Sequence, residues 1–279
     1  MEFWWLQLFD KYLNNLNTHV VLHIVIQPPT FMQITVANLA DAVMYPFLFI
    51  TGYITTCFIL NHYQSHLVRL YMQSPTYKSF LKYTTIVHNT GLIAFSAYVC
   101  VAITNAHLQG EQYEPYVMNL CWAFTYSKIW EFIDTYLILL KGQTTIFLQK
   151  YHHVGALLCW WLCCYYKLLE IYQPTALNAF IHTIMYSYYL ASMLGYKWTA
   201  IKPYITSLQL LQFFGGGYIS LFVYFIPTIQ SANSTQDLLL NGTFMSLVLF
   251  YMYLTGLIYL FLWFFVKEYC GKKPKLVAA

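Results

Sequence analysis

Residues 241–266, NGTFMSLVLFYMYLTGLIYLFLWFFV, contain no charged side chain. A helix of this length crosses the hydrocarbon core of a bilayer, which is roughly 30 Å thick. Six further apolar segments of similar length lie near residues 42–61, 83–105, 117–140, 146–168, 176–196 and 204–227. Backbone polar groups in lipid find partners only within helices or closed barrels, and segments this long favour helices. We predict an all-α integral membrane protein with seven transmembrane helices.

The composition supports a membrane class. Of the 279 residues, 59% are hydrophobic and only 9% are charged, whereas about a quarter of the residues of a soluble domain are charged. The net charge of +4 is small and no run of lysine and arginine with interleaved aromatic residues occurs, so no nucleic-acid partner is expected. The cysteines lie mostly within apolar runs and form no CxxC pair, which gives no signal for a zinc site or a disulfide framework.

Basic residues gather in alternate loops between the apolar segments. Arg69, Lys78 and Lys82 lie between the first two segments, and four lysines follow residue 266. The positive-inside rule therefore places the C-terminus in the cytosol and, with seven crossings, the N-terminus in the lumen. We divide the chain into an N-terminal lumenal or interfacial segment (1–40), a seven-helix domain (41–268) and a cytosolic basic tail (269–279).

Polar side chains at membrane depth are costly unless paired, and they are candidates for function. The third segment carries KIWEFIDT at residues 128–135, in which Lys128, Glu131 and Asp134 share one face of a helix. A lysine and a glutamate can also pair merely to hold helices together. The additional Asp134 favours a functional site.

Three other segments carry polar motifs of the same kind. The fourth opens with QKYHH at residues 149–153, and the fifth carries NAFIHTIMYSYY at residues 178–189, whose polar members form a single stripe. The sixth carries TSLQLLQ at residues 206–212. Lone histidines or glutamines often satisfy helix contacts only, but four helices with such residues predict one common interior site.

A di-iron oxygenase is one alternative, because the chain has nine histidines and such sites use several histidine boxes. The topology, however, separates His19 and His23 from His62 and His66, and Gln149 interrupts the remaining box. We predict that no metal is bound. A transporter or receptor without enzymatic activity is the other alternative, although no inverted repeat is apparent.

Taken together, the four motifs resemble those of the ELO-type fatty acid elongases. KIWEFIDT resembles the KxxExxDT motif of that family, QKYHH the QxxHH variant of its histidine box, NAFIHTIMYSYY its NxxHxxMYxYY, and TSLQLLQ its TxxQxxQ; His88–Asn89 is a weaker match. The resemblance covers about residues 40–268. It implies a multi-pass endoplasmic reticulum enzyme whose seven helices surround a central acyl/CoA cavity.

The resemblance also implies the reaction. Such an enzyme, a very-long-chain 3-oxoacyl-CoA synthase, condenses malonyl-CoA with a long-chain acyl-CoA to give 3-oxoacyl-CoA, CO2 and CoA. Both CoA esters are substrates, and no cofactor is implied. The QxxHH variant favours polyunsaturated acyl chains, with saturated or monounsaturated chains as the alternative. Candidate partners are the ketoacyl reductase, dehydratase and enoyl reductase of the elongation cycle, and a second copy of the chain.

Roles for individual residues follow from this resemblance and from side-chain chemistry. A histidine accepts the acyl group as an acyl-imidazole, or the histidines act only as acid–base groups in a ternary complex. The predicted catalytic residues are His152, His153 and His182. The predicted substrate-positioning residues are Lys128, Glu131, Asp134, Gln149, Asn178, Tyr186, Tyr189, Gln209 and Gln212. The predicted CoA-phosphate ligands are Lys141, Lys150, Lys197 and Lys202.

Overall fold

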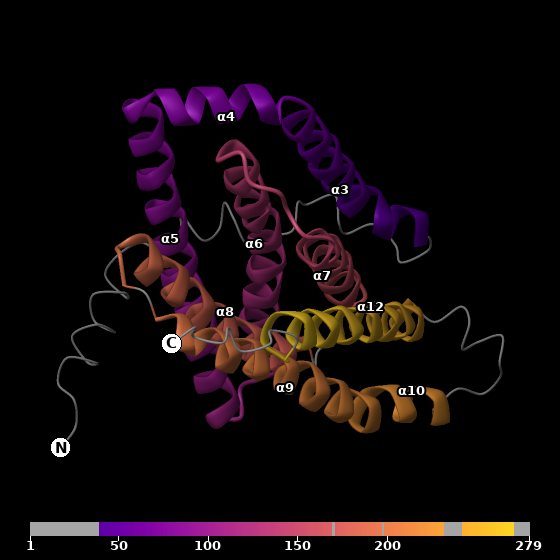
Figure 1. The fold of residues 1–279 in the computed structure, drawn as a ribbon. Helices are drawn as coiled ribbons and strands as arrows, with labels where there is room; N and C mark the ends of the chain where they lie inside the picture. The colour runs from indigo at the N-terminus through magenta and orange to yellow at the C-terminus, as the bar shows by residue number, and fades with distance from the viewer. Residues whose placement is uncertain (1–38, 169–170, 197, 232–241, 271–279) are drawn as a thin grey trace, which may run out of the picture. The chain divides into compact units, whose positions relative to one another are not determined.

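The computed structural model describes residues 39–168, 171–196, 198–231 and 242–270, and all regular structure within these ranges is helical (Figure 1). The helices are α3 (Leu39–His62), α4 (Gln64–Gln73), α5 (Pro75–Leu108), α6 (Pro115–Leu140), α7 (Phe147–Tyr165), α8 (Tyr172–Met193), α9 (Lys202–Ser220), α10 (Ile226–Gln230) and α12 (Gly242–Phe265). A short 3-10 helix, η3 (Thr199–Ile201), precedes α9. The π-helices η4 (Leu221–Phe225) and η5 (Val266–Cys270) follow α9 and α12.

The chain divides into two compact units, Met1–Ala37 and Asn38–Ala279. The first unit lies outside the described residues, and with it nearly all of the predicted segment 1–40, including His19 and His23. Most of the predicted tail, residues 271–279, and Lys197 lie outside them as well. The division of the seven-helix domain from its flanking segments therefore stays a prediction.

Each of the seven predicted spans coincides with a helix or with a continuous helical run. Three helical stretches are long and apolar enough to cross a membrane, namely Ala42–His62, Pro75–Leu108 and Gly242–Cys270. Their outer faces expose large apolar side chains such as Phe58, Val87 and Met252, which is expected of helices that face lipid. The membrane class is supported, whereas the number of crossings and the orientation of the termini stay predictions.

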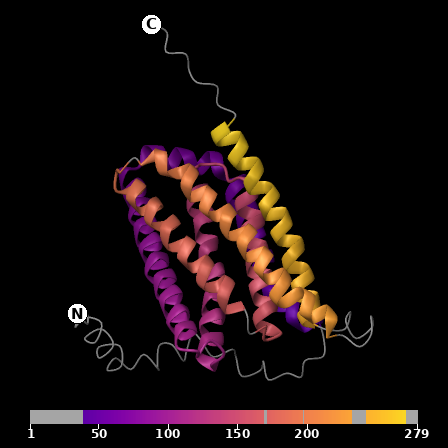
Figure 2. The ribbon, with the colours of Figure 1, turned by 90° about the horizontal axis from the view of Figure 1, so that it is seen from below.

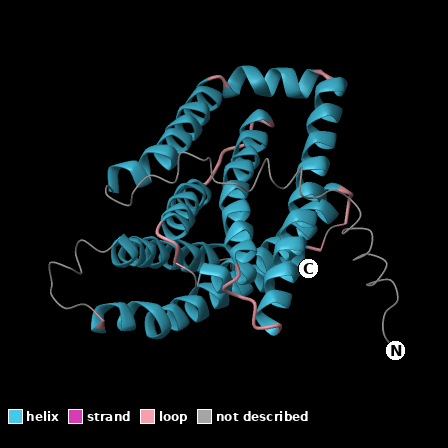
Figure 3. Cartoon of the chain, turned by 180° about the vertical axis from the view of Figure 1, so that it is seen from behind, coloured by secondary structure: helices cyan, strands magenta, loops and turns pink. Residues whose placement is uncertain are grey.

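The region between the first two predicted spans is more helical than the sequence pattern predicts. Helix α4 fills most of that loop and is the helix across the top of Figure 3. Helix α5 begins at Pro75, eight residues before the predicted boundary at 83. Ser74 explains the early start. Its side chain accepts a hydrogen bond from the Tyr77 backbone N–H at 3.2 Å, and Pro75 occupies the first helical position.

Four of the long helices end in the same way. In α5, α6, α7 and α8 the two residues after the C-cap donate their N–H groups back to carbonyls of the last turn, as in a Schellman motif. The first of these residues adopts a positive φ, and it is a glycine in three cases: Gly110, Gly142 and Gly195. In α7 it is Lys167, with φ 53°. These caps satisfy backbone carbonyls that would otherwise lack partners.

Five helices form a closed ring of neighbours. Helix α6 contacts α7, α7 contacts α12, α12 contacts α9, α9 contacts α8, and α8 returns to α6. Helix α5 packs along α8 and α6, and α3 packs against α6 and α7. Figure 2 shows α9 and α12 running side by side along this ring. All four polar motifs lie on helices of the ring, so they can face a common interior.

Candidate functional site

The polar residues of α6 and α8 meet at a buried lysine. Lys128 Nζ donates to Glu131 Oε1 at 2.8 Å and to Asn178 Oδ1 at 3.2 Å, and all three side chains are buried. The ammonium also lies 3.9 Å from the centre of the Phe124 ring. A buried charge is tolerated only when paired and hydrogen-bonded. The two motifs therefore depend on each other for their placement.

His182 joins the same carboxylate. Its Nδ1 lies 3.2 Å from Glu131 Oε1, and its ring centre lies 6.3 Å from that of His152. One ligand atom from each of Glu131, His152 and His182 lies within 4.8 Å of the others, an arrangement that could hold a metal ion. Lys128, however, donates to the same Oε1, so a bound cation would meet the ammonium at once. This repulsion supports the prediction of a site without metal, which stays a prediction.

Asp134 belongs to a second group of side chains. His88 Nε2 donates to its Oδ1 at 2.8 Å, and the Tyr186 hydroxyl donates to its Oδ2 at 2.6 Å. The three acid–base residues of KIWEFIDT therefore belong to two separate groups. Lys128 and Glu131 pair with each other, whereas Asp134 bonds to side chains of α5 and α8. His88 was matched only weakly in the sequence and was not placed in the predicted site.

The two adjacent histidines of α7 have different surroundings. His153 is buried, and its ring centre lies 6.0 Å from that of Tyr53 and 6.1 Å from that of Phe132. His152 faces α12, where its Nδ1 lies 2.9 Å from the Tyr253 hydroxyl. Neighbouring positions on a helix point about 100° apart, so each histidine contacts a different wall of the site.

Tyr253 is a residue that sequence reasoning missed. Besides contacting the imidazole, its hydroxyl donates to the His152 backbone carbonyl at 3.4 Å. The chain contains 27 tyrosines, and Tyr253 lies inside the uncharged stretch 241–266 with no polar neighbour at helical spacing. Only the packing of α12 against α7 identifies it.

A cavity of about 580 Å³ opens beside these groups, and we call it the polar cavity because charged and amide side chains lie among its many apolar ones. Its lining includes the predicted site residues Glu131, Asp134, Lys141, Gln149, His152, His153, Asn178, His182, Tyr186, Tyr189, Lys202, Gln209 and Gln212. Lys128 lies behind this lining, held between Glu131 and Asn178. Lys150 is exposed and is not part of the lining. The structure therefore brings together nearly all of the predicted site residues that it describes.

Lys141 stands at the end of α6, outside the predicted span. Its Nζ donates to Thr85 Oγ1 at 2.8 Å. Burial lowers the pKa of the Lys141 ammonium, and the nearby Asp134 carboxylate opposes that shift. A partly desolvated ammonium on a cavity wall is suited to an anionic ligand.

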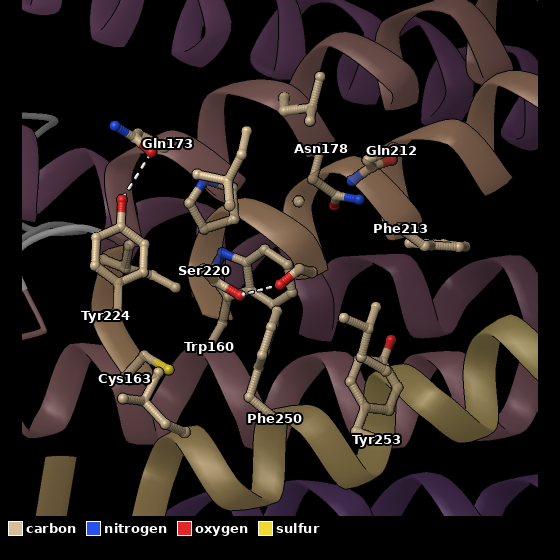
Figure 4. Close-up of a pocket in the computed structure, with 18 of the residues that line it drawn as sticks. Trp160, Cys163, Gln173, Asn178, Gln212, Phe213, Ser220, Tyr224, Phe250 and Tyr253 are labelled. Carbon is tan, nitrogen blue, oxygen red and sulfur yellow. Dashed lines mark hydrogen bonds between the residues drawn. The ribbon is translucent and has the colours of Figure 1, made fainter. Parts of the chain in front are cut away.

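A second, apolar cavity of about 100 Å³ is shown in Figure 4, and His152 is one of the residues that line it. Trp160, Phe250 and Leu257 contribute to its walls. Gln173 and Tyr224 lie on the opposite side of this view from Tyr253 and Gln212, and the Tyr224 hydroxyl donates to Gln173 Oε1 at 2.7 Å. This pairing satisfies the polar groups, so this end of the cavity presents little free hydrogen-bonding capacity.

Four residues line both cavities: His152, Asn178, Gln212 and Phe213. Among the described histidines, His152 alone has this position. One cavity offers charged and titratable groups and the other offers apolar walls. The arrangement suits a molecule with a polar, anionic head and an apolar tail, whose reactive carbon would lie at His152.

Comparison with known proteins gives a consistent result. The sequence profile described as "ELO: GNS1/SUR4 family" matches residues 38–276. Fatty acid elongase 2 of Trypanosoma cruzi is 31% identical over 219 residues, which cover 70% of this chain and 76% of that protein. Very long chain fatty acid elongase 2 of Rattus norvegicus is 30% identical over 210 residues, which cover 67% and 69%.

Very long chain fatty acid elongase 5 of Homo sapiens is 35% identical over a shorter stretch of 148 residues, 46% of this chain and 48% of that protein. No solved structure gives a significant match.

Proposed function

This chain belongs to the ELO (GNS1/SUR4) family, and we propose that it is a fatty acid elongase that condenses malonyl-CoA with a long-chain acyl-CoA. The products are a 3-oxoacyl-CoA two carbons longer, CO2 and CoA. The observation that carries this proposal is the position of His152 between the polar and the apolar cavity. An acyl chain whose first carbons enter the apolar cavity would have its thioester beside this imidazole, with the CoA moiety on the polar side.

In the first step His152 acts as nucleophile. Its Nδ1 faces the Tyr253 hydroxyl, so Nε2 is the nitrogen available to the substrate. Nε2 forms a bond to the thioester carbonyl carbon, the C–S bond breaks, and its electron pair leaves with CoA as the thiolate. The acyl group is then held on the imidazole, as in other covalent catalysis by activated nucleophiles.

In the second step malonyl-CoA enters the polar cavity. Loss of CO2 leaves its electron pair on the adjacent carbon as an enolate, which attacks the acyl carbon. The bond from that carbon to Nε2 breaks, and its electron pair returns to the imidazole. The Lys128 ammonium, fixed by Glu131 and Asn178, supplies preorganised positive charge near the developing enolate.

The other histidines have supporting roles. His182, with Nδ1 3.2 Å from Glu131 Oε1, lines the same cavity and positions the malonyl thioester or transfers protons. His153 lines the polar cavity on the side of α3. Gln149, Gln209 and Gln212 offer amide donors and acceptors that do not titrate.

The finer assignments follow from the motifs. The QxxHH variant at residues 149–153 favours polyunsaturated acyl chains over saturated or monounsaturated ones. We place the enzyme in the endoplasmic reticulum membrane, beside the reductases and the dehydratase that complete each elongation cycle. Of the three proposed phosphate ligands that the structure describes, Lys141 and Lys202 lie on the wall of the polar cavity and are better placed than Lys150.

The proposal is tested with membranes that contain the expressed chain, radiolabelled malonyl-CoA and a panel of acyl-CoA substrates. We expect malonyl-CoA-dependent formation of 3-oxoacyl products. Incubation with acyl-CoA alone should add the mass of the acyl group to the peptide that contains His152. Elongation without any adduct under single-turnover conditions would favour the ternary-complex mechanism, and no elongation of any acyl-CoA would reject the function.

A further inference from the structure

The contact between α7 and α12 is built from two tyrosines that lie over two glycines. A Cβ atom on Gly155 would collide with the Tyr253 ring, and a Cβ atom on Gly256 would collide with the Tyr151 side chain. The two tyrosine rings stack with their centres 5.7 Å apart and an interplanar angle of 26°. Small residues at such positions let membrane helices approach closely. Here they create the space that each ring occupies.

This arrangement places the Tyr253 hydroxyl on His152. The ring crosses α7 at Gly155, one turn beyond the histidine, and its oxygen reaches His152 Nδ1 at 2.9 Å. The same oxygen lies 3.4 Å from the His152 backbone carbonyl, which can only accept a hydrogen bond. When the hydroxyl donates to that carbonyl, its lone pairs are left for the imidazole. The Nδ1 atom must then carry the proton that it donates to Tyr253.

We infer that Tyr253 is a positioning residue for the proposed reaction, which holds His152 in the tautomer whose Nε2 lone pair faces the substrate. This inference rests on the proposed function for its catalytic consequence, but the tautomer itself is a property of the resting protein. A neutral imidazole has one protonated and one unprotonated nitrogen, and its hydrogen-bond partner decides which is which. Without the hydroxyl, the two tautomers interchange and Nε2 is blocked part of the time.

His182 provides an internal reference for this effect. Its Nδ1 faces the Glu131 carboxylate at 3.2 Å, and Tyr253 is not its partner. Removal of the Tyr253 hydroxyl should therefore alter His152 and leave His182 unchanged. A general disturbance of the helix ring would affect both.

The decisive variant is Tyr253→Phe, which retains the ring over Gly155 and removes only the hydroxyl. The matched control is Tyr251→Phe on the same helix. The Tyr251 hydroxyl bonds to Ser220 Oγ at 2.5 Å and donates to the Gly217 carbonyl at 3.1 Å, with no histidine involved. Both variants lose one hydroxyl of α12 that makes two part-buried hydrogen bonds, so both carry a similar structural cost.

The first measurement needs no elongation activity. The purified proteins are treated with diethyl pyrocarbonate, which acylates an unprotonated imidazole nitrogen, and modified peptides are quantified by mass spectrometry. We expect acylation at His152 to slow several-fold in Tyr253→Phe and to match wild type in Tyr251→Phe, with His182 unchanged in both. Equal rates at His152 in all three proteins would overturn the inference, whether or not the chain is an elongase.

The second measurement is steady-state elongation. Because Nε2 is blocked only part of the time without the hydroxyl, kcat of Tyr253→Phe should fall several-fold, as acylation of His152 does, while KM for acyl-CoA stays near the wild-type value. A fall that Tyr251→Phe shares, or a change in KM alone, would mean that Tyr253 only packs the helices and would also overturn the inference. Absence of elongation by the wild-type protein would instead reject the proposed function.

Discussion

The two cavities that meet at His152 differ in volume and in chemistry. The cavity on one side is about 580 Å³, and its walls carry lysines, carboxylates, histidines and amides among apolar side chains such as Ile181 and Phe264. The cavity on the other side is about 100 Å³, its walls are mostly aliphatic and aromatic, and Gln173 and Tyr224 at its far end bond to each other. The proposed function uses this contrast, because it places the CoA moiety on one side and the acyl chain on the other. In the proposed reaction, the thioester lies at His152, where the two cavities meet.

The largest effect on activity is expected when His152, which lines both cavities, is replaced. In His152→Ala the acyl group has no nitrogen to accept it, so we expect elongation to fall by at least about 10³-fold, as in other enzymes that lose their nucleophile. Product formation from radiolabelled malonyl-CoA measures the loss, with protein amount checked by immunoblot. A variant that retains a tenth of the activity would contradict the covalent role.

The next largest effect is expected on stability, at the Lys128–Glu131 pair beside the polar cavity. Lys128→Met leaves Glu131 without its cation partner in a buried position, and breaking such a pair typically costs about 3–5 kcal/mol. Thermal unfolding in detergent should show the loss. The double variant Lys128→Met/Glu131→Gln should recover much of the stability but not the activity. A single variant as stable as wild type would show that the pair is not as desolvated as its burial indicates.

The apolar side should respond through product length. Tyr224→Ala opens the end of the cavity away from Tyr253 and should shift the product distribution toward chains one elongation step longer. Each additional buried methylene contributes about 0.8 kcal/mol. Product analysis by gas chromatography measures the shift. Tyr224→Phe, which keeps the ring and loses the bond to Gln173, is the control and should give products of wild-type length; longer products from it would assign the limit to the hydrogen bond instead.

The smallest effect is expected at the mouth of the polar cavity. Lys202→Met removes one charge that a CoA phosphate could meet, and a solvent-exposed ion pair contributes about 0.2–1 kcal/mol. KM for malonyl-CoA should rise a few-fold at low ionic strength, and the difference should shrink as salt screens the charges. Lys78→Met removes an exposed lysine that is not part of this lining and should leave KM unchanged. An equal rise in both would indicate attraction by overall charge.

The sequence predicts the polar half of this comparison well and the apolar half poorly. Charged and amide side chains are conspicuous in apolar helices, so the four motifs identify four of the five ring helices, all but α12, and most of the polar lining. The apolar walls are built from residues such as Trp160 and Phe250, which differ in no visible way from those that face lipid. Their position depends on how the helices rotate against each other.

The sequence also failed to identify His88 and Tyr253, because their roles depend on how the helices pack. His88 reaches Asp134 from α5, and Tyr253 reaches His152 from α12, 101 positions away along the chain. Helical spacing connects residues three or four positions apart and carries no information on contacts between distant helices. The early start of α5 was instead available from local signals, since Ser74 and Pro75 form a conventional N-terminus.

The tyrosine and glycine pairs between α7 and α12 have a consequence for how this sequence can change over generations. A larger residue at Gly155 has no room unless Tyr253 shrinks, and a smaller residue at Tyr253 leaves an unfilled space and His152 without its partner. Positions 155 and 253 should therefore covary among related sequences, and 151 with 256 should do the same. Positions 155 and 253 should vary less than positions 151 and 256, because Tyr253 supplies the hydrogen bond to His152 as well as the packing against Gly155.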